Sequence, residues 1–264
     1  MMRLDLWLCE EHDLEIQVAR SYILQGLVSV NGEKILQAGR TFRPDRDNLE
    51  FRRPPDFRNR GTAKLRPALE YIKSTLKKDE EPPWVYWPCL DIGASHGGFT
   101  AALLEASARR IYSLDVAYGI FDYQLRKRED VILLERKNVR HLEPSWFDDL
   151  FLSASGIFIV CDVSFLSLRP VLESVIDFFR LHMQCGFQGL FLLKHQFEAS
   201  HQTQQGVLRD DELRRKLEDD IEIFLKERGL NLLGSIPAGL PGRKGNRETF
   251  LWLEFPKPAQ SAGT

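Results

Sequence analysis

The feature that most constrains the fold is a glycine-rich turn between a short apolar run and an amphipathic stretch. Residues 87–106 read WPCLDIGASHGGFTAALLEA. Glycines let the backbone of such a turn pass close to a ligand, and they let the following helix point its N-terminus at that ligand. Taken alone, the turn is also compatible with a tight connection that binds nothing. The pattern predicts a strand, a turn and a helix, with a small-molecule site at the turn.

Further apolar runs alternate with helical patterns along the rest of the chain. Strands are expected within RRIYSLDVA, DVILLER, GIFIVCDVSFLSL and GLFLLKHQF, helices over residues 171–183 and 210–228, and a terminal strand pair near residues 231–236 and 248–255. Strands that alternate with helices form a parallel sheet with helices on both faces. The predicted fold class is therefore α/β, with a Rossmann-like domain.

The first fifty residues predict a separate small α+β module. Residues 2–12 and 15–25 have the apolar spacing of two short helices, and Asn31-Gly32 is a strong signal for a two-residue hairpin. The prolines and arginines that follow indicate a linker. We expect a module at residues 1–52, a basic linker at 53–63, a catalytic domain at 64–256 that opens with a helix over 64–78, and a frayed tail at 257–264. Pro67 would then lie in the first turn of that helix, where proline is tolerated.

The distribution of charge along the chain is uneven, although the formal net charge of the 264 residues is only −2. Residues 1–50 hold six Lys or Arg and nine Asp or Glu, whereas residues 51–78 hold nine and two. Phosphate binding depends mainly on Lys and Arg, so the junction is the better RNA-binding candidate, against the alternative of a solvated loop. RNA contacts are expected at Arg20, Lys34, Arg40, Arg43, Arg46, Arg52, Arg53, Arg58 and Arg60.

Cysteine usage and hydropathy indicate the compartment. The four cysteines form no C-x-x-C pair, and the histidines have no metal-ligand spacing, so neither a disulfide framework nor a metal site is expected. No window approaches the ~18 uninterrupted apolar residues of a membrane span, and the first residues lack a small-residue cleavage site. The sequence predicts a cytoplasmic protein with reduced thiols.

A second carboxylate sharpens the interpretation of the turn. Asp115 ends the run IYSLD, 24 residues after Asp91, where nucleotide-binding units place the acidic residue that binds ribose hydroxyls. NAD enzymes usually carry G-x-G-x-x-G, whereas here an Asp precedes GASHGG, and this arrangement resembles class I methyltransferases. S-adenosyl-L-methionine is therefore favoured over a dinucleotide, which leaves an NAD-dependent oxidoreductase as the alternative. The expected cofactor residues are Asp91, Gly93, Ala94, Ser95, Gly97, Gly98 and Asp115.

Four motifs, DIGASHGGFT, NVRHL, DVSF and LKHQFE, follow one another in a characteristic order. Over residues 2–255 the chain resembles the hemolysin A (TlyA-type) rRNA methyltransferases, which join an S4-like RNA-binding domain to an FtsJ-like methyltransferase domain. The resemblance implies 2′-O-methylation of ribosomal RNA, with ribosomal RNA or ribosomal subunits as partners. It also adds Asn138 and Asp162 to the expected cofactor residues.

The catalytic Lys-Asp-Lys-Glu constellation of FtsJ-like enzymes falls by motif matching on Lys64, Asp162, Lys194 and Glu248. A ribose 2′-hydroxyl is a poor nucleophile, so methyl transfer needs alignment of the reacting atoms and help in removing the proton. Lys194, at the end of an apolar strand, is the expected general base, while Asp162 and Glu248 would hold the ammonium groups in place.

Each of the four residues also has a purely structural interpretation. Lys64 can be a solvated cation at a helix start, Glu248 an exposed strand residue, and Asp162 a cap at a strand end. Lys64 stands in RGTAKL where the family tends to carry RGGLKL, so this match differs most. For Lys194, between GLFLL and HQF, the structural interpretation is the hardest to sustain, because an unpaired charge beside buried strand positions is costly.

Three other functions remain open at this point. A cysteine can attack a pyrimidine ring, so base methylation through Cys161 is conceivable; but if Asp162 faces the site, its strand neighbour faces the core. A catalytically silent RNA-binding or ribosome assembly factor would keep the fold and only bind cofactor. A secreted hemolysin is suggested by the family name alone, since the sequence offers no pore-forming segment. The sequence predicts neither the modified nucleotide nor an oligomeric state.

Overall fold

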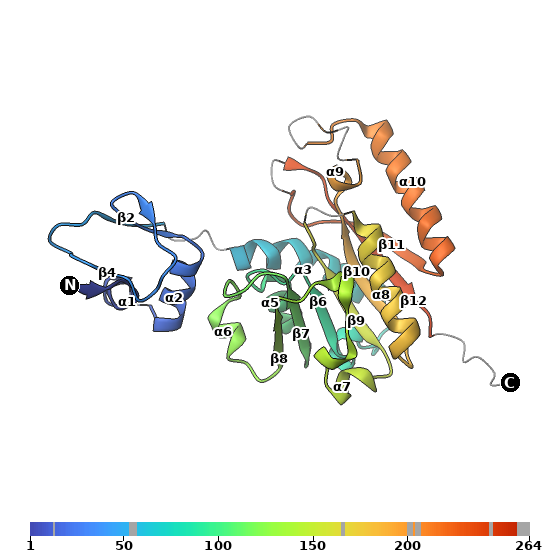
Figure 1. Cartoon of the computed structure of the whole chain (residues 1–264). Coiled ribbons are helices and arrows are strands. Elements are labelled where there is room, and N and C mark those ends of the chain that lie inside the picture. Colours follow the sequence, from blue (N-terminus) through green and yellow to red (C-terminus); the bar gives the residue numbers. More distant parts are fainter. Residues whose placement is uncertain are drawn as a thin grey trace.

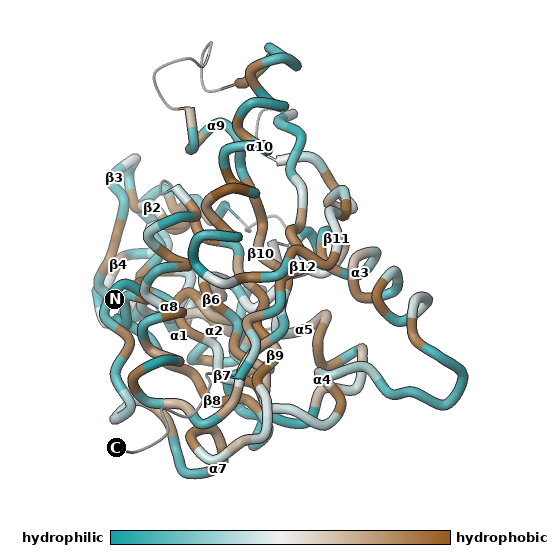
Figure 2. Tube along the Cα trace, turned by 90° about the vertical axis from the view of Figure 1, so that its right-hand side faces the viewer, coloured by the Kyte–Doolittle hydropathy of each residue, from teal (hydrophilic) through white to brown (hydrophobic). Residues whose placement is uncertain are grey.

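The computed structural model describes residues 1–12, 14–52, 57–164, 167–199, 203, 207–242 and 245–257, with the side chains of residues 57 and 58 left out. Figure 1 shows a small N-terminal module beside a larger domain built on a central sheet. The hydropathy colouring of Figure 2 places apolar residues along the strands of that sheet. Among the described residues, no helix is both long and apolar enough to cross a membrane.

The central sheet has seven strands in the order β11-β12-β10-β9-β6-β7-β8. Five strands are parallel: β6 (Cys89–Ile92), β7 (Ile111–Asp115), β8 (Val131–Glu135), β9 (Ile157–Cys161) and β10 (Phe187–Leu193). The terminal strand β12 (Thr249–Phe255) runs antiparallel to β10 and to β11 (Asn231–Pro237). The chain leaves β6 toward β7 and returns to β9 on the other side, so the strand order reverses between β6 and β9. Ligands of open α/β sheets bind at such a switch point, outside the carboxyl ends of the strands.

Helices cover both faces of this sheet, which confirms the predicted α/β, Rossmann-like fold class. One face packs on α3 (Phe57–Thr75), α4 (Pro83–Tyr86) and α5 (Gly98–Glu105), and the other on α8 (Leu168–His182) and α10 (Asp211–Arg228). Along β9, Phe158 and Val160 join the first core, while Ile159 and Cys161 join the second. This alternation follows from the two-residue period of a strand, and burial on both faces explains the continuous apolar run.

Shorter elements complete the domain. They are α6 (Tyr123–Arg126), η1 (Val139–His141), η2 (Pro144–Trp146), α7 (Asp149–Leu152) and α9 (His195–Glu198).

Helix α3 begins before the expected position. It starts at Phe57, so residues 57–63 of the expected linker are helical, and Pro67 lies in the helix interior instead of the first turn. Proline removes one helical hydrogen bond, the one that would reach the carbonyl of Ala63. Gly239 fits at this point: its amide donates to the Lys64 carbonyl at 3.0 Å, and a Cβ on it would lie 2.4 Å from the Ala63 carbonyl oxygen. A close tertiary contact at the proline therefore accommodates a helix that the local sequence argues against.

The N-terminal module contains the two helices and the hairpin that the sequence predicts. Its elements are β1 (Met2–Arg3), α1 (Leu4–His12), α2 (Ile16–Leu24), β2 (Val28–Val30), β3 (Glu33–Lys34), β4 (Thr41–Phe42) and β5 (Leu49–Phe51). Asn31 and Gly32 both have positive φ, as a two-residue hairpin requires. The module has its own small core around Leu4, Leu8 and Ile23. The assignment of this module as S4-like stays a prediction.

Helix α2 joins the module to the larger domain. Glu15, which precedes α2, pairs with Lys127 at 2.8 Å and accepts from Gln124 at 3.1 Å. At the other end of α2, the Ser21 hydroxyl donates to the Gly119 carbonyl, and Gln25 Oε1 lies 3.4 Å from His96 Nε2. The module therefore contacts the loops that follow β6 and β7.

Candidate active site

A cavity of about 600 Å³ opens at the carboxyl ends of β6, β9 and β10, at the switch point of the sheet. It is lined by Arg60, Gly61, Lys64, Gly93, Ala94, Ser95, His96, Gly98, Phe99, Asp162, Ser164, Lys194, Gln196, Phe197, Asn246 and Glu248. The cavity thus brings together all four expected catalytic residues with the glycine-rich turn, although they come from distant parts of the sequence.

The glycine-rich turn passes very close to the strand end that carries Asp162. Gly93 has φ of +83°, and a Cβ on it would lie 2.6 Å from the Asp162 carbonyl oxygen. Both the left-handed backbone and the lack of room explain why only glycine fits. The Asp162 amide in turn donates to the Ile92 carbonyl at 2.9 Å. The turn and the catalytic strand end are therefore fixed relative to each other by backbone contacts.

Asp162 lies between two lysines. Its Oδ1 is 2.5 Å from Lys194 Nζ and its Oδ2 is 3.2 Å from Lys64 Nζ. Lys64 Nζ also lies 2.8 Å from Glu248 Oε2. The side chains of Lys64, Lys194 and Glu248 are each at most 10% exposed, and that of Asp162 is 22% exposed. Two cations and two anions thus form one continuous ion-paired cluster in the cavity wall.

The cluster is electrically balanced, as burial requires. An isolated buried charge is very costly, whereas paired charges with additional hydrogen bonds are tolerated. Burial acts to raise the pKa of Asp162, but the nearby charges and hydrogen bonds of Lys194 and Lys64 together lower it. Asp162 is therefore ionised at neutral pH and holds both ammonium groups.

Lys194 and Lys64 differ in their other partners. Lys194 Nζ donates to the Val163 carbonyl at 2.8 Å and to the Ser164 hydroxyl at 3.1 Å, both of which are neutral. Lys64 instead faces two carboxylates, those of Asp162 and Glu248. Lys64 thus contacts two charged partners, whereas Lys194 contacts one carboxylate and two neutral groups.

The expected cofactor residues fall into two groups. Gly93, Ala94, Ser95, Gly98 and Asp162 line the cavity, while Gly97 lies just behind it as the residue before α5. Asp115, at the end of β7, accepts from the Ser95 and Ala117 amides at 2.7 Å each. The exposed Asn138 accepts from the Arg140 amide at 3.0 Å. Asp115 and Asn138 thus lie on the β7 and β8 side, outside the cavity lining.

Asp91 is fully buried behind the turn and does not line the cavity. Its Oδ2 accepts from the Thr100 hydroxyl at 2.6 Å, and Thr100 lies 2.7 Å from the Ser113 hydroxyl. Burial raises the pKa of Asp91 to about 7, although the Thr100 bonds act against this rise. Its Oδ1 has no hydrogen-bond partner among the described residues. The carboxylate therefore supports the turn from behind and retains capacity for a donor.

These features fit S-adenosyl-L-methionine. The turn has no Cβ at Gly93, Asp115 reaches the turn through the Ser95 amide, and the ionised Asp162 places negative charge in the cavity wall, where a cationic ligand is favoured. Cys161 is fully buried in the core, and burial raises the pKa of its thiol to about 12. Cys161 is therefore not placed to act as a thiolate nucleophile. This agrees with the expectation that Cys161 faces the core because its strand neighbour Asp162 faces the site. Among the described residues, no group of three or more His, Cys, Asp or Glu could hold a metal ion.

The expected RNA-binding residues differ in their surroundings. Arg20 pairs with the buried Asp5 at 2.9 Å inside the module, which gives it a structural role, and Arg40 lies 3.6 Å from Glu33. Lys34, Arg43, Arg46 and Arg52 are exposed. Arg60 lines the cavity mouth and donates to the Pro241 carbonyl at 2.7 Å. Arg53 lies outside the described residues, as does the side chain of Arg58.

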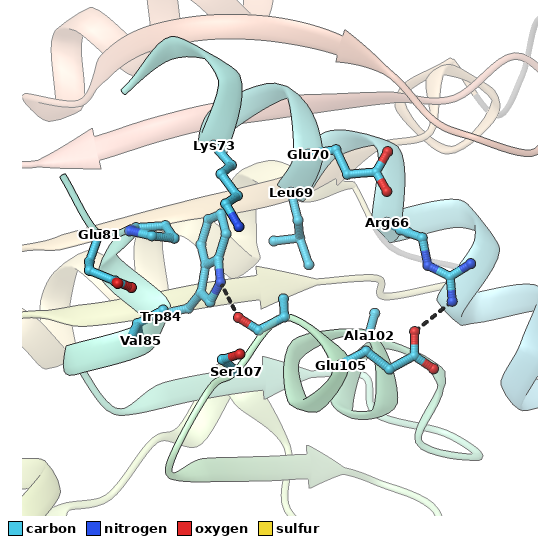
Figure 3. A pocket seen from close by; sticks show the side chains of 12 residues that line it. Arg66, Leu69, Glu70, Lys73, Glu81, Trp84, Val85, Ala102, Glu105 and Ser107 are labelled. Atoms are coloured by element: carbon cyan, nitrogen blue, oxygen red, sulfur yellow. Dashed lines mark hydrogen bonds and ion pairs between the residues drawn. The ribbon is translucent and has the colours of Figure 1, made fainter. Parts of the chain in front are cut away.

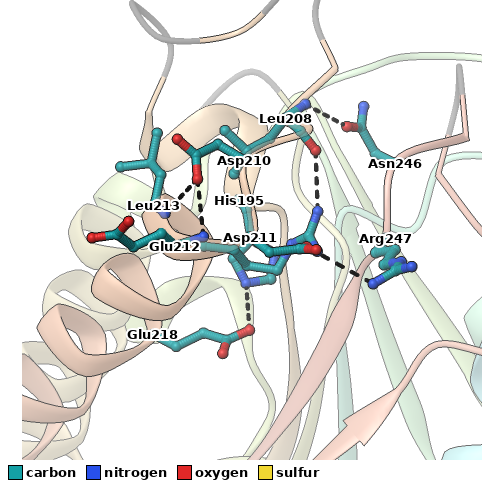
Figure 4. Close-up of polar contacts among 10 residues, drawn as sticks. His195, Leu208, Asp210, Asp211, Glu212, Leu213, Glu218, Asn246 and Arg247 are labelled. Carbon is teal, nitrogen blue, oxygen red and sulfur yellow. Dashed lines mark hydrogen bonds and ion pairs between the residues drawn. The ribbon is translucent and has the colours of Figure 1, made fainter.

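A network of polar contacts supports the segments that carry Lys194 and Glu248 (Figure 4). His195, next to Lys194, bonds through Nε2 to Glu218 of α10 at 2.8 Å, and burial lowers its pKa. Asn246, two residues before Glu248, accepts from the Leu208 amide at 3.2 Å. Helix α10 and the segment before it thereby anchor two loops of the cavity wall. His195 thus acts as a local hydrogen-bonding group.

A second cavity lies at α3, α4 and α5, away from the predicted catalytic and cofactor residues (Figure 3). It measures about 360 Å³ and contains the Trp84 indole, whose Nε1 donates to the Ala106 carbonyl at 3.0 Å. Arg66 pairs with Glu105 at its edge. The cavity contains none of the predicted site residues.

Sequence reasoning missed seven residues of the main cavity: Gly61, His96, Phe99, Ser164, Gln196, Phe197 and Asn246. A positional signal was present, because Gln196 and Phe197 follow Lys194 directly and Asn246 comes two residues before Glu248. Residues that flank a catalytic residue at a strand end share its loop and therefore its cavity.

Comparison with known proteins places this geometry in a family. The chain is 32% identical to hemolysin A of Brachyspira hyodysenteriae, over 94% of this chain and 97% of that protein. It is 35% identical to the 16S/23S rRNA (cytidine-2′-O)-methyltransferase TlyA of Mycobacterium tuberculosis, over 62% of this chain and 59% of that protein. A solved structure described as a candidate hemolysin from Streptococcus thermophilus is 27% identical, with a TM-score of 0.65, over 97% of this chain and 88% of that one.

The family model that matches is that of the FtsJ-like methyltransferases, over residues 57–255. The match begins at the first residue of α3 and ends at the last residue of β12, so it covers the whole sheet and every residue of the ion-paired cluster. The resemblance inferred from the motifs is thereby confirmed, and the chain belongs to the FtsJ-like methyltransferase family.

Proposed function

We propose that this protein methylates the 2′-hydroxyl of a ribose in ribosomal RNA, with S-adenosyl-L-methionine as the methyl donor and Lys194 as the general base. The observation that carries the proposal is the Asp162 carboxylate held between Lys194 and Lys64 beside the glycine-rich turn. The printed activity of the Mycobacterium tuberculosis relative, cytidine-2′-O-methylation of 16S and 23S rRNA, supports the same reaction. We also infer that it works in the cytoplasm, on ribosomal RNA or ribosomal subunits there.

The chain would hold the cofactor along the turn and the end of β7. Gly93, Ala94, Ser95, Gly97 and Gly98 would form the cradle, Asp115 and Asn138 would bind the adenosine part, and Asp162, with Asp91 buried behind the turn, would bind the methionine part. When bound there, S-adenosyl-L-methionine supplies an electrophilic methyl group.

The remaining chemistry is removal of the hydroxyl proton. Lys194 accepts this proton in its neutral form, and it is the lysine with one carboxylate and two neutral partners. Lys64 stays charged between Asp162 and Glu248 and stabilises negative charge that develops on the ribose oxygen. Asp162 fixes both ammonium groups at once, so that the acceptor and the stabilising cation keep a constant separation.

RNA binding would use the cations at the mouth of the cavity and on the module. Arg60 is exposed and lines the cavity, where it can meet a phosphate next to the target ribose. Lys34, Arg43 and Arg52 are exposed on the module. Such contacts to phosphates position RNA without reading its sequence.

The test is to incubate purified protein with methyl-labelled S-adenosyl-L-methionine and unmodified ribosomal subunits, then to digest the RNA and identify labelled nucleosides. A labelled 2′-O-methylnucleoside is expected from the wild type. Lys194→Ala should reduce the rate by about 10²–10⁴, which is the usual contribution of general-base catalysis. Lys226→Ala, an exposed lysine on α10, is the matched control and should keep the wild-type rate.

Two outcomes would contradict the proposal. A labelled base would keep the methyltransferase and exclude the ribose mechanism. Absence of label, with cofactor binding demonstrated, would indicate an RNA-binding or assembly factor without catalysis.

A further inference from the structure

Two residues of the cavity wall, Gln196 and Phe197, have no part in the proposed proton transfer. Both belong to the short α9 that follows Lys194. Gln196 is 9% exposed, and its Oε1 is buried with no hydrogen-bond partner among the described residues. Phe197 is half-buried, and its ring centroid lies 5.8 Å from Lys194 Nζ. An unpaired amide oxygen and an aromatic ring therefore lie together beside the proposed base.

Their position along the sheet separates them from the cofactor. The strand order β7-β6-β9-β10 places Asp115 and the glycine-rich turn on one side of Asp162, and Lys194 with α9 on the other. Adenosine bound at Asp115 therefore extends away from α9. The space next to Gln196 and Phe197 is left for the second substrate.

The connectivity of a nucleotide says which part of that substrate reaches α9. A nucleobase is attached to C1′ of the ribose, the carbon next to C2′, whose hydroxyl would meet Lys194. Two carbons, C2′ and C1′, thus separate the base from the reacting oxygen, so the base lies close to the proposed general base Lys194 and within reach of the neighbouring Phe197 ring, whose centroid is 5.8 Å from Lys194 Nζ. Aromatic side chains bind unstacked RNA bases in this way in many proteins.

We propose that Gln196 and Phe197 form the binding site for the base of the target nucleotide. The base stacks on the Phe197 ring, and Gln196 turns its amide oxygen to accept a hydrogen bond from the edge of the base. The acceptor favours a base with an exocyclic amino group, cytosine or adenine, over uracil, which presents a carbonyl oxygen there. This inference rests on the proposed function, because it takes a ribose at Lys194 as given.

The variants to compare are Phe197→Ala, Phe197→Leu, Gln196→Ala and Gln196→Glu. Gln188→Ala is the matched control, since Gln188 lies at the end of β10 that is remote from α9 and bonds to Glu254. Each protein is assayed for its Kd for unmodified ribosomal subunits and for its Kd for S-adenosyl-L-methionine. Methyl transfer is then measured on subunits that carry cytidine or uridine at the position the wild type modifies.

Phe197→Ala should weaken RNA binding by about tenfold, with Phe197→Leu also weakened, because stacking needs the ring and not only apolar volume. Gln196→Ala should lose the preference for cytidine, and Gln196→Glu, which keeps an acceptor, should retain it. Cofactor binding should stay within twofold of wild type in all four, which shows that the fold is intact.

The inference is wrong if Phe197→Ala and Gln196→Ala keep both the wild-type affinity for RNA and the wild-type base preference. The measurements can contradict this inference and the proposed function separately. A wild type that binds subunits but forms no 2′-O-methylnucleoside contradicts the proposed reaction, while weaker RNA binding by Phe197→Ala would still support the base site.

Discussion

The central residue of the cavity is Asp162, whose carboxylate meets two ammonium groups and whose backbone leaves no room for a side chain at Gly93. One strand end thus fixes both lysines of the cluster and the turn expected to hold the cofactor. The sequence motifs identified these residues, and Lys64, the poorest match, lies in the same cluster as the other three. The motifs could not predict how the surroundings of the two lysines differ. That difference depends on the neutral partners of Lys194 and on Glu248 beside Lys64.

The buried Asp91 makes stability depend on pH in a defined direction. Its pKa is raised to about 7 in the folded protein, so the folded state binds more protons than the unfolded state between the usual Asp range and pH 7. This contribution to stability is fully present below pH 4 or so and is lost as pH rises through about 7. Asp91→Asn removes the titration while keeping an acceptor for Thr100.

We therefore expect the free energy of unfolding of Asp91→Asn to rise relative to that of the wild type as pH increases from 5 to 8. The full gain is about 1.4 kcal/mol for each unit by which folding raises the pKa of Asp91. Urea unfolding without cofactor, repeated across this range for both proteins, measures the difference. If the free energies of unfolding of the two proteins changed with pH in parallel, the pKa of Asp91 would not be raised in the folded state.

Helices α3 and α5 cross at very short distance, and the crossing positions Lys64. A Cβ on Gly61 of α3 would lie 2.9 Å from the Gly98 Cα of α5. Gly61→Val should push the helices apart, cost about 1–3 kcal/mol of stability as overpacking does, and slow methyl transfer by moving Lys64 away from Asp162. Thermal unfolding and the rate on ribosomal subunits measure the two effects.

Gly39→Val is the control for that change, because Gly39 has open space around it. It should leave both quantities unchanged. Gly61→Val with unchanged unfolding temperature and rate would mean that the two helices can separate without cost.

Periodicity and turn signals predicted most of the helices and strands. The apolar runs predicted the strands and Asn31-Gly32 predicted the hairpin, because these signals are local. Helix α3 was placed too late, since Pro67 is tolerated in its interior only through a contact with Gly239, far along the chain. Gln196 was missed for the same kind of reason: nothing in HQF shows that its amide oxygen is buried without a partner.

The two parts of the molecule are linked through ion pairs and hydrogen bonds at both ends of α2. Glu15 and Lys127 pair at 2.8 Å across the junction, and both are about half exposed. Exposed pairs contribute little to stability, so their effect should appear in the orientation of the module. That orientation decides whether cations on the module and Arg60 can bind one RNA together.

Exchanging the charges of Glu15 and Lys127 tests whether this ion pair sets the orientation of the module. Lys127→Glu should weaken binding to ribosomal subunits by about twofold or more through repulsion from Glu15, and Glu15→Lys combined with it should restore binding. Affinity for S-adenosyl-L-methionine, measured on the same proteins, should not change. If the double variant binds RNA as weakly as the single one, the pair does not set the orientation of the module.

The ion-paired cluster also affects how the chain folds. Its members are contributed by α3, the end of β9, the end of β10 and the residue before β12, and the Lys64–Asp162 pair alone closes a loop of 98 residues. Contacts of such long range form late, because the entropy of closing the loop must be overcome first. A growing chain that has completed its first five parallel strands still lacks Glu248. The cluster is therefore complete only once the antiparallel strand β12, which follows Glu248 directly, has paired with β10.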